Sequence, residues 1–205
     1  MFKLITIAAL TILGAASASF VKTPASIFAP DAATITRVCN AAYTVHDKQA
    51  VDAALPYEAS LSLGDHQATF WSSLSGVFTS CRLRNQQFQP KKIPVKPEPV
   101  NVALYGRVLK LVQAKDWAVA LSARDVKGKE LSRVLPDKQE KYAADTRYWN
   151  VSCRSNHCLW SGSNYYQFTV AGTPFLAAVK RGARVVVMAR RYGMLDEYAL
   201  PAGLK

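Results

Sequence analysis

Apolar residues in the first half of the chain recur three or four positions apart, which is the spacing of an amphipathic helix. One such stripe consists of Ile35, Val38, Cys39 and Ala42. A second consists of Phe70, Trp71, Leu74, Val77, Phe78 and Cys81. Asp31 and Asp65 precede the two stripes, where an acidic side chain caps a helix. We therefore predict a helical region over residues 19–85, in which a pair of helices packs through these stripes.

The pattern changes after residue 85. Residues 86–99 contain four prolines and predict an extended, Pro-rich linker. Residues 100–205 carry short β-rich apolar runs separated by polar turns, and the strongest of these runs covers 184–191. We expect short helices over 129–135 and 175–180, and little order in the tail from Gly193. The fold class is therefore α+β, with the helical pair followed by a small antiparallel β-domain. An OB-like barrel would suit five or six such strands, and an open antiparallel sheet packed on the helices fits nearly as well.

The first eighteen residues have the layout of a secretory signal peptide. Lys3 gives a positive start, residues 4–13 are almost wholly apolar, and Ala16-Ser17-Ala18 forms a small-residue cleavage site. The apolar run is shorter than the roughly twenty residues that a membrane-spanning helix needs. We expect a mature chain that begins near Ser19, has no transmembrane span, and is periplasmic or secreted.

Export changes the interpretation of the four cysteines, because an even count in an oxidising compartment indicates disulfides. Cys153 and Cys158 enclose four residues, which suits a turn between two strands, and this leaves Cys39 to pair with Cys81. The second pairing agrees with the helices, since both of its cysteines lie on apolar stripes. The spacing lacks the paired C-x-x-C units of structural zinc sites, so we expect neither a metal nor a cofactor.

The sequence contains no recognisable catalytic motif. His46, His66 and His157 form no H-x-x-x-H pair, and the G-x-S-x-G, phosphate-loop and dinucleotide-binding patterns do not occur. We therefore predict no catalytic residue and favour a protein that is not an enzyme. The alternative is a secreted hydrolase whose site combines residues distant in the sequence, with His157 as the one named candidate.

Basic residues are the remaining functional signal. The chain has a formal net charge of +12, and residues 100–205 hold 17 Lys and Arg against 8 acidic residues. Such a balance indicates an anionic partner. The basic and aromatic residues that we expect to bind it are Arg107, Lys110, Trp149, Arg154, Tyr165, Arg184, Arg190 and Arg191. In the opposing interpretation, the aromatic residues are core residues and the charges simply alternate with them on the outer faces of strands.

These observations predict an exported interaction protein whose basic β-domain binds an acidic protein or glycan. An inhibitor, an immunity protein and an adaptor of an envelope machine are all roles of this kind. The alternative is a periplasmic or secreted nucleic-acid-binding protein with an OB-like face, because arginine beside exposed aromatic rings holds single strands. Contact with a membrane surface is a further alternative, since its phospholipids are also anionic.

Overall fold

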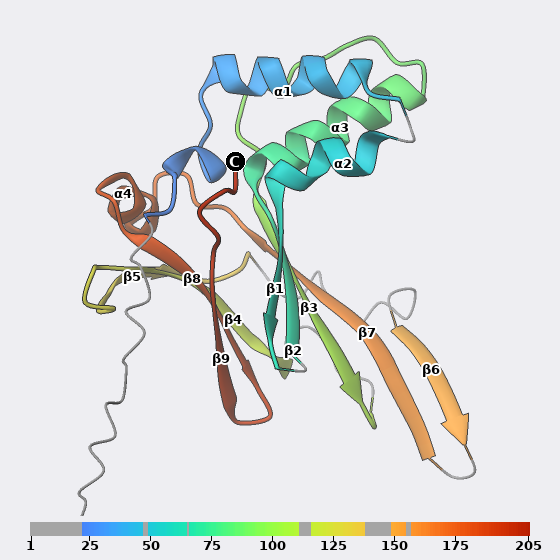
Figure 1. Cartoon of the computed structure of the whole chain (residues 1–205), viewed down its shortest axis with the longest axis vertical. Coiled ribbons are helices and arrows are strands. Elements are labelled where there is room, and N and C mark those ends of the chain that lie inside the picture. The colour runs from blue at the N-terminus through green and yellow to red at the C-terminus, as the bar shows by residue number, and fades with distance from the viewer. Residues whose placement is uncertain (1–21, 47–48, 65, 111–115, 138–148, 155–156) are drawn as a thin grey trace, which may run out of the picture.

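The computed structural model describes residues 22–205 except 47–48, 65, 111–115, 138–148 and 155–156 (Figure 1). The expected signal peptide, residues 1–18, lies outside the described residues. The helices are α1 (Ala32–Thr44), α2 (Ala50–Ala54), α3 (Ser73–Gln86) and α4 (Pro174–Lys180), with the 3-10 turns η1 (Ala25–Ile27) and η3 (Leu55–Tyr57). Within the described ranges, none of these helices has the length and apolar character needed to cross a membrane.

The strands form two antiparallel sheets, so the protein is a mixed α+β protein. The strands are β1 (Glu58–Leu63), β2 (His66–Trp71), β3 (Val100–Val108), β4 (Ala118–Arg124), β5 (Glu130–Val134), β6 (Trp149–Arg154), β7 (His157–Phe168), β8 (Arg184–Arg191) and β9 (Met194–Ala199). One sheet has the order β1-β2-β3-β7-β6 and the other β5-β4-β8-β9. Strands β1 and β9 lie side by side without pairing across the sheets, so the barrel is not closed and the OB-like arrangement is not confirmed.

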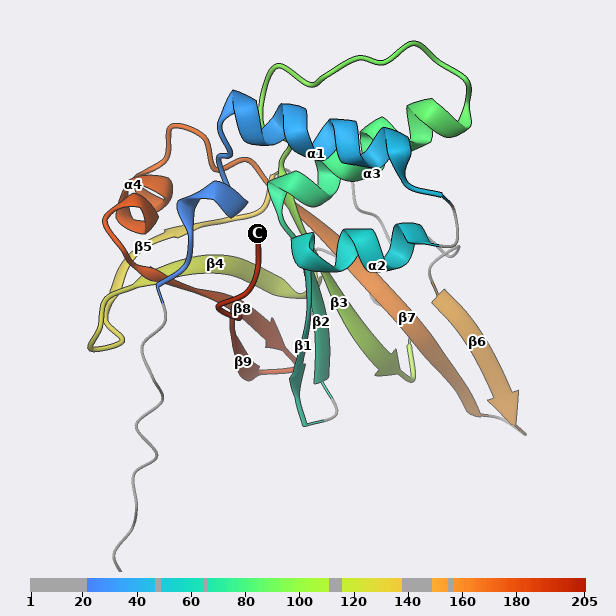
Figure 2. The ribbon, with the colours of Figure 1, turned by 45° about the horizontal axis from the view of Figure 1, so that its top comes forward.

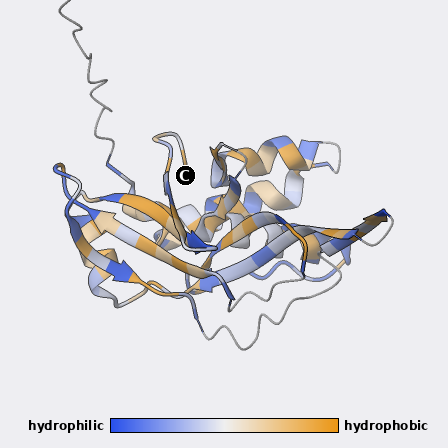
Figure 3. Cartoon of the chain, turned by 90° about the horizontal axis from the view of Figure 1, so that it is seen from below, coloured by the Kyte–Doolittle hydropathy of each residue, from blue (hydrophilic) through white to orange (hydrophobic). Residues whose placement is uncertain are grey.

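The two sheets share one hydrophobic core. The first sheet contributes Phe70 and Leu104, and the second contributes Leu121 and Val187, all with essentially no exposed surface. Figure 3 shows apolar segments on the strands of both sheets, and buried positions alternate with more exposed ones along β2 and β9. The core is also covered by η1 and α4, where Phe28 packs edge-on against Phe70 and Phe175 at centroid distances of 5.9 and 5.3 Å.

Helices α1 and α3 form a smaller layer at one end of the sheets (Figures 1 and 2). Asp31 caps α1 by accepting a hydrogen bond from the backbone N–H of Thr34 at 2.7 Å. The apolar stripes of the two helices form a second core, and the disulfide Cys39–Cys81 joins them with a Cα–Cα distance of 5.4 Å. This is the pairing that the periodicity of the two helices led us to expect.

Residues 58–71 correct the expectation that the whole of 19–85 is helical. They form the hairpin β1–β2, and β2 pairs with β3, so this hairpin belongs to the five-stranded sheet. Buried residues alternate along both strands, with Ala59 and Leu61 on β1 and Ala68 and Phe70 on β2. Phe70 and Trp71 of the predicted helical stripe therefore belong to β2, and α3 begins only at Ser73.

The later strands agree with the sequence in part. The hairpin β6–β7 carries the disulfide Cys153–Cys158, α4 lies at the expected helix, and β8 spans the strongest β-rich run. Two segments differ. Residues 130–134, which lie within the helix predicted over 129–135, form β5, and residues 194–199 of the tail predicted to be irregular form β9. Both strands are stabilised by pairing, β5 with β4 and β9 with β8, which local sequence does not reveal.

The Pro-rich segment has neither helix nor strand between residues 87 and 99, and it runs beside α1 and α3 (Figure 2). Lys91 places its Nζ 5.7 Å from the centre of the Tyr43 ring on α1. The C-terminus is also attached to the body of the protein. The backbone N–H of Lys205 donates to the carbonyl of Pro56 at 2.8 Å, and the Ser72 hydroxyl donates to the carbonyl of Lys205 at 2.8 Å.

Candidate functional site

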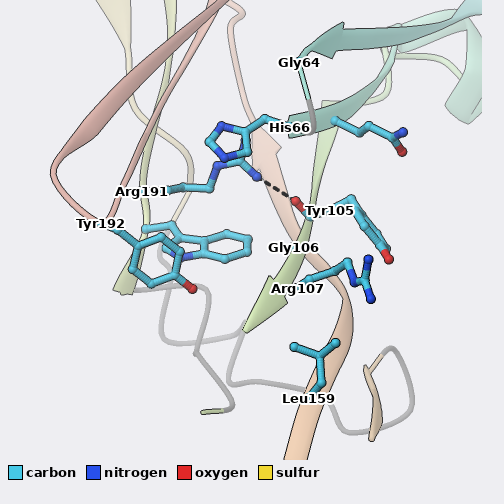
Figure 4. Close-up of a pocket in the computed structure, with 10 residues that line it drawn as sticks. Gly64, His66, Tyr105, Gly106, Arg107, Leu159, Arg191 and Tyr192 are labelled. Atoms are coloured by element: carbon cyan, nitrogen blue, oxygen red, sulfur yellow. Dashed lines mark hydrogen bonds between the residues drawn. The ribbon is translucent and has the colours of Figure 1, made fainter. Parts of the chain in front are cut away.

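A pocket of about 640 Å³ opens where the ends of the two sheets meet (Figure 4). We call it the inter-sheet pocket. The described residues that line it are Gly64, His66, Gln67, Tyr105, Gly106, Arg107, Trp117, Leu159, Arg191 and Tyr192. The β1–β2 and β8–β9 turns lie at this end of the sheets, which points away from α1 and α3 (Figure 1). Its volume is in the range of small-molecule binding sites.

Two local features of the chain shape this pocket. Tyr192 and Gly193 form the turn between β8 and β9 with φ values of 52° and 82°, as in a type I′ hairpin turn. This turn leaves the Tyr192 side chain 63% exposed at the pocket. Gly106 lies on β3 directly against Trp117, and a Cβ atom at this position would overlap Cη2 of the indole ring. The missing side chain lets Trp117 pack against the strand and form the pocket wall.

Replacing Gly106 with alanine is expected to destabilise the protein by about 1–3 kcal/mol, because the added methyl group forces the buried Trp117 ring to move. Urea denaturation followed by tryptophan fluorescence measures the change. Gly203→Ala is the matched control, since a Cβ there meets nothing within 4 Å. If Gly106→Ala were as stable as Gly203→Ala, the packing of Trp117 against β3 would not require a glycine at position 106.

A buried ionic cluster joins the two sheets at the pocket. Arg191 on β8 is 2% exposed, and its Nη2 lies 2.6 Å from Oδ2 of Asp196 on β9. The same guanidinium donates through Nη1 to the backbone carbonyl of Tyr105 on β3 at 2.6 Å (Figure 4). His66 on β2 completes the link, with Nδ1 2.8 Å from Oδ2 of Asp196. The cluster therefore connects β2 and β3 of one sheet to β8 and β9 of the other.

Asp196 is ionised in this cluster. Burial by itself raises the pKa of its carboxyl group, but hydrogen bonds from Arg191 and His66 outweigh burial and hold that pKa below its usual range. An ionised carboxylate only accepts hydrogen bonds, so His66 carries its proton on Nδ1. Burial also raises the pKa of the neighbouring Tyr198 hydroxyl to about 12, so this group stays protonated at neutral pH.

Arg107 is the accessible cation of the pocket. It is exposed on β3, and no described residue forms an ion pair with it. None of the described lining residues is acidic, and the charge of Arg191 is already balanced by Asp196. A guanidinium without a carboxylate partner at a concave surface is a ready site for a carboxylate, sulfate or phosphate oxygen.

The structure does not bring the eight sequence-predicted binding residues to one surface. Arg107 lies at the inter-sheet pocket, whereas Trp149 is 4% exposed and belongs to the core. Arg191 lines the pocket, but it is buried in its ion pair. Tyr165 stacks on Trp71 with a centroid distance of 6.0 Å and an interplanar angle of 22°.

The other four predicted residues lie apart from one another. Lys110 and Arg154 are exposed beyond the end of β3 and at the end of β6. Arg190 is exposed on the four-stranded sheet, opposite Ala118 of β4, and Arg184 is partly buried on the same strand. Basic character is therefore spread over several faces, and the pocket contains two members of the predicted set.

Sequence reasoning missed His66, Gln67, Tyr105, Trp117 and Tyr192 as pocket residues. Gly193 closely follows the β-rich run over 184–191, and a glycine in this place is a turn signal that could have located the turn at Tyr192. No local signal places His66 beside Asp196, because they are 130 residues apart in the sequence. His157, the candidate for a hydrolase, is exposed beside the Cys153–Cys158 disulfide, opposite Arg154.

Metal binding finds no support among the described side chains, where no group of three or more His, Cys, Asp or Glu could hold an ion. Comparisons with known protein families, with curated proteins and with solved structures found no match. The functional argument therefore depends on the geometry of the pocket.

Proposed function

We propose that this chain is an exported, non-enzymatic binding protein that recognises an anionic partner through the inter-sheet pocket and its rim. The observation that carries the proposal is Arg107, a cation with no ion-pair partner among the described residues, at the edge of a 640 Å³ pocket. The overall charge of +12 adds long-range attraction for such a partner. The two disulfides are consistent with export to an oxidising compartment.

Nucleic acid is the weaker choice of partner. Single-stranded nucleic acid is held by a row of exposed aromatic rings beside basic groups. Of the aromatic residues that the sequence suggested for this role, Trp149 is buried and Tyr165 stacks on Trp71. An acidic glycan or an acidic protein can bind without a row of stacked aromatic side chains. The accessible guanidinium of Arg107 can bind the carboxylate of either.

A hydrolase is the second candidate, and the pair of His66 and Asp196 favours it. A carboxylate that orients a histidine at a pocket is an arrangement that general bases use. Two features place this candidate second. The Asp196 oxygen that contacts His66 also accepts from the buried Arg191, and the described lining contains no Ser, Thr or Cys nucleophile. Hydrolysis that survives in a His66→Ala variant would exclude this pair as its cause.

Replacing Arg107 with alanine is expected to weaken binding of an anionic polymer about ten- to a hundredfold, because a charge-assisted hydrogen bond is lost. Biolayer interferometry against immobilised polygalacturonate, polyglutamate and single-stranded DNA measures the affinity. Arg190→Ala is the matched control, since it removes the same charge from a different sheet. We expect this control to change affinity less than threefold.

Two outcomes would contradict the proposal. Equal losses in the Arg107 and Arg190 variants would mean that binding follows net charge rather than the pocket. Tight binding by DNA alone, with a steep dependence on salt, would favour the nucleic-acid alternative.

A further inference from the structure

We propose that the outer face of the five-stranded sheet binds an extended acidic glycan, with sugar rings on its aromatic side chains and a sugar carboxylate at Arg107. This inference rests on the proposed function, because Arg107 is the cation of both, and it names the class of ligand and the surface that holds it. The face lies on the side of the sheet opposite the core. We use the name outer platform for the outward-facing residues of β3 and of the segments of β2 and β7 that pair with it.

Strand register places the members of the outer platform side by side. Val102 and Leu104 on β3 have no exposed surface and belong to the core, so the residues that alternate with them point to the opposite face. Figure 4 shows Tyr105 and Arg107 on this side of β3, away from Tyr192. Cross-strand pairing brings outward-facing residues of β2 and β7 to the same levels.

The outer platform is polar but almost uncharged. Its polar members are three amides and three hydroxyls, namely Gln67, Asn101, Gln167, Thr69, Ser161 and Ser163. Arg107 is the one charged side chain among its described members, and Ala103 is the one aliphatic side chain. Every described member except Ala103 is exposed or half-buried. Amides and hydroxyls both donate and accept hydrogen bonds, as the hydroxyl groups of a sugar require.

Trp71 and Tyr165 form the aromatic part of the outer platform. They lie on β2 and β7, the two neighbours of β3, whose backbones are about 9–10 Å apart at the usual strand spacing. Their ring centroids are 6.0 Å apart with an interplanar angle of 22°, so the side chains lean toward each other across β3 and their rings are nearly parallel. Ala103 of β3 faces outward, yet it is 5% exposed, as expected where larger side chains lie above it. The C–H groups on the face of a sugar ring pack well against such rings.

The aromatic and charged members follow one line along β3. The two rings lie level with residues 101 and 103, and Tyr105 and Arg107 follow at two-residue intervals. The distance from residue 101 to residue 107 is about 20 Å at the rise of an antiparallel strand. This length accommodates several sugar rings of an extended chain, with the carboxylate-binding end at Arg107.

The composition of the outer platform favours a glycan over a protein or a nucleic acid. The centre of a protein interface is an apolar patch, whereas the one aliphatic side chain described here, Ala103, is buried. Nucleic acid carries a charge on every phosphate, whereas the platform offers the single guanidinium of Arg107. One guanidinium suits a glycan in which only some of the sugars carry carboxylates. Hyaluronate has this pattern, because glucuronate alternates with N-acetylglucosamine along its chain.

Isothermal titration calorimetry with a hyaluronate hexasaccharide tests the inference. Chitohexaose is the comparison, since it contains N-acetylglucosamine without carboxylates. We expect hyaluronate to bind about tenfold more tightly, and Arg107→Ala should remove most of this difference, because a charge-assisted hydrogen bond is lost. Arg190→Ala removes the same charge from the other sheet and should leave the difference unchanged.

The aromatic contribution is tested by Trp71→Ala and Tyr105→Ala. Each should weaken binding of both sugars about three- to tenfold, because each removes part of the aromatic surface. Phe88→Ala is the matched control, since Phe88 is 98% exposed beyond the end of α3 and outside the outer platform. Circular dichroism establishes that the variants are folded. Gln67→Ala changes an exposed side chain of the platform and takes the place of any variant that is not.

Acrylamide quenching of tryptophan fluorescence locates the ligand independently. Trp71 is half-buried, whereas Trp117 and Trp149 are 1% and 4% exposed. Bound hyaluronate should therefore protect Trp71 from the quencher, and this protection should be absent from Trp71→Phe. Protection that persists in Trp71→Phe would place the ligand elsewhere and overturn the inference.

The results separate this inference from the proposed function. If polyglutamate binds in an Arg107-dependent manner and hyaluronate does not bind, only the inference fails. If no anionic probe depends on Arg107, both fail. A loss of hyaluronate binding in Tyr192→Ala with none in Trp71→Ala would place the sugar in the inter-sheet pocket and overturn the inference alone. Equal affinity for hyaluronate and chitohexaose would also overturn it, because the carboxylate would then contribute nothing.

Discussion

Replacing Asp196 with asparagine is expected to lower the free energy of unfolding by about 3–5 kcal/mol, because it leaves a buried charge without its partner. Arg191 is 2% exposed, and two of its nitrogens donate to Asp196. The carboxylate also holds His66 of the opposite sheet. The substitution therefore removes the ionic link between the sheets while it preserves the shape of the side chain.

Glu197→Gln is the matched control, one residue further along β9. Glu197 pairs with Arg124, with Oε2 2.8 Å from Nη1, and the Glu197 side chain is 39% exposed. The Arg124 side chain is 15% exposed, so this pair is more accessible to water than that of Arg191 and Asp196, and Glu197→Gln should cost less stability than Asp196→Asn. Urea denaturation of both variants at neutral pH measures the two changes. A loss below 1 kcal/mol for Asp196→Asn would mean that the buried cluster does not hold the sheets together.

The effect of Asp196→Asn should depend on pH. The folded state holds the pKa of Asp196 below its ordinary value of 3.8, so the unfolded chain binds this proton first as the pH falls. The stabilisation from the ionised carboxylate is therefore fully present above the ordinary value and is lost as the pH falls through the folded-state pKa. The difference between wild type and variant should be constant at neutral pH and should shrink below about pH 4. A difference that grows in acid would contradict this sign.

Removing the Cys39–Cys81 disulfide by a double alanine substitution is expected to cost about 4 kcal/mol, from the chain entropy of a loop of this length. The two cysteines are 42 residues apart and have no exposed surface. They join α1 to α3, whose shared core is small and separate from the core between the sheets. Without the disulfide, we expect the helical layer to unfold at a lower denaturant concentration than the sheets.

Cys153→Ala/Cys158→Ala provides the comparison. This disulfide spans only 5 residues in the hairpin β6–β7 and lies at the surface, so the same entropy argument predicts about 2 kcal/mol. Circular dichroism at 222 nm follows the helices, and tryptophan fluorescence follows the sheets. A larger loss for Cys153→Ala/Cys158→Ala than for the helical pair would reject the loop-length explanation.

Local sequence determined much of the secondary structure. Helical periodicity predicted α1, and the β-rich run at 184–191 predicted β8. The same periodicity placed Cys39 and Cys81 on facing helices, which correctly indicated their disulfide. These features depend on residues close together in the chain, so their pattern is readable without knowledge of the fold. The hairpin β1–β2 instead depends on pairing with the distant strand β3, and the local pattern wrongly predicted helix there.

Only the tertiary structure decided which charged residues can reach a ligand. Arg190 and Arg191 are neighbours on β8, so they point to opposite faces of the sheet, and their sequence does not say which one is buried. The structure buries Arg191 because Asp196 and the carbonyl of Tyr105 satisfy its charge and donors. The inter-sheet pocket arises in the same way, from turns and strands between residues 64 and 192 that meet only when the sheets pack. Local patterning determined α1, α4 and β8, whereas long-range pairing and packing determined β1, β2, β5 and β9 and the candidate binding site.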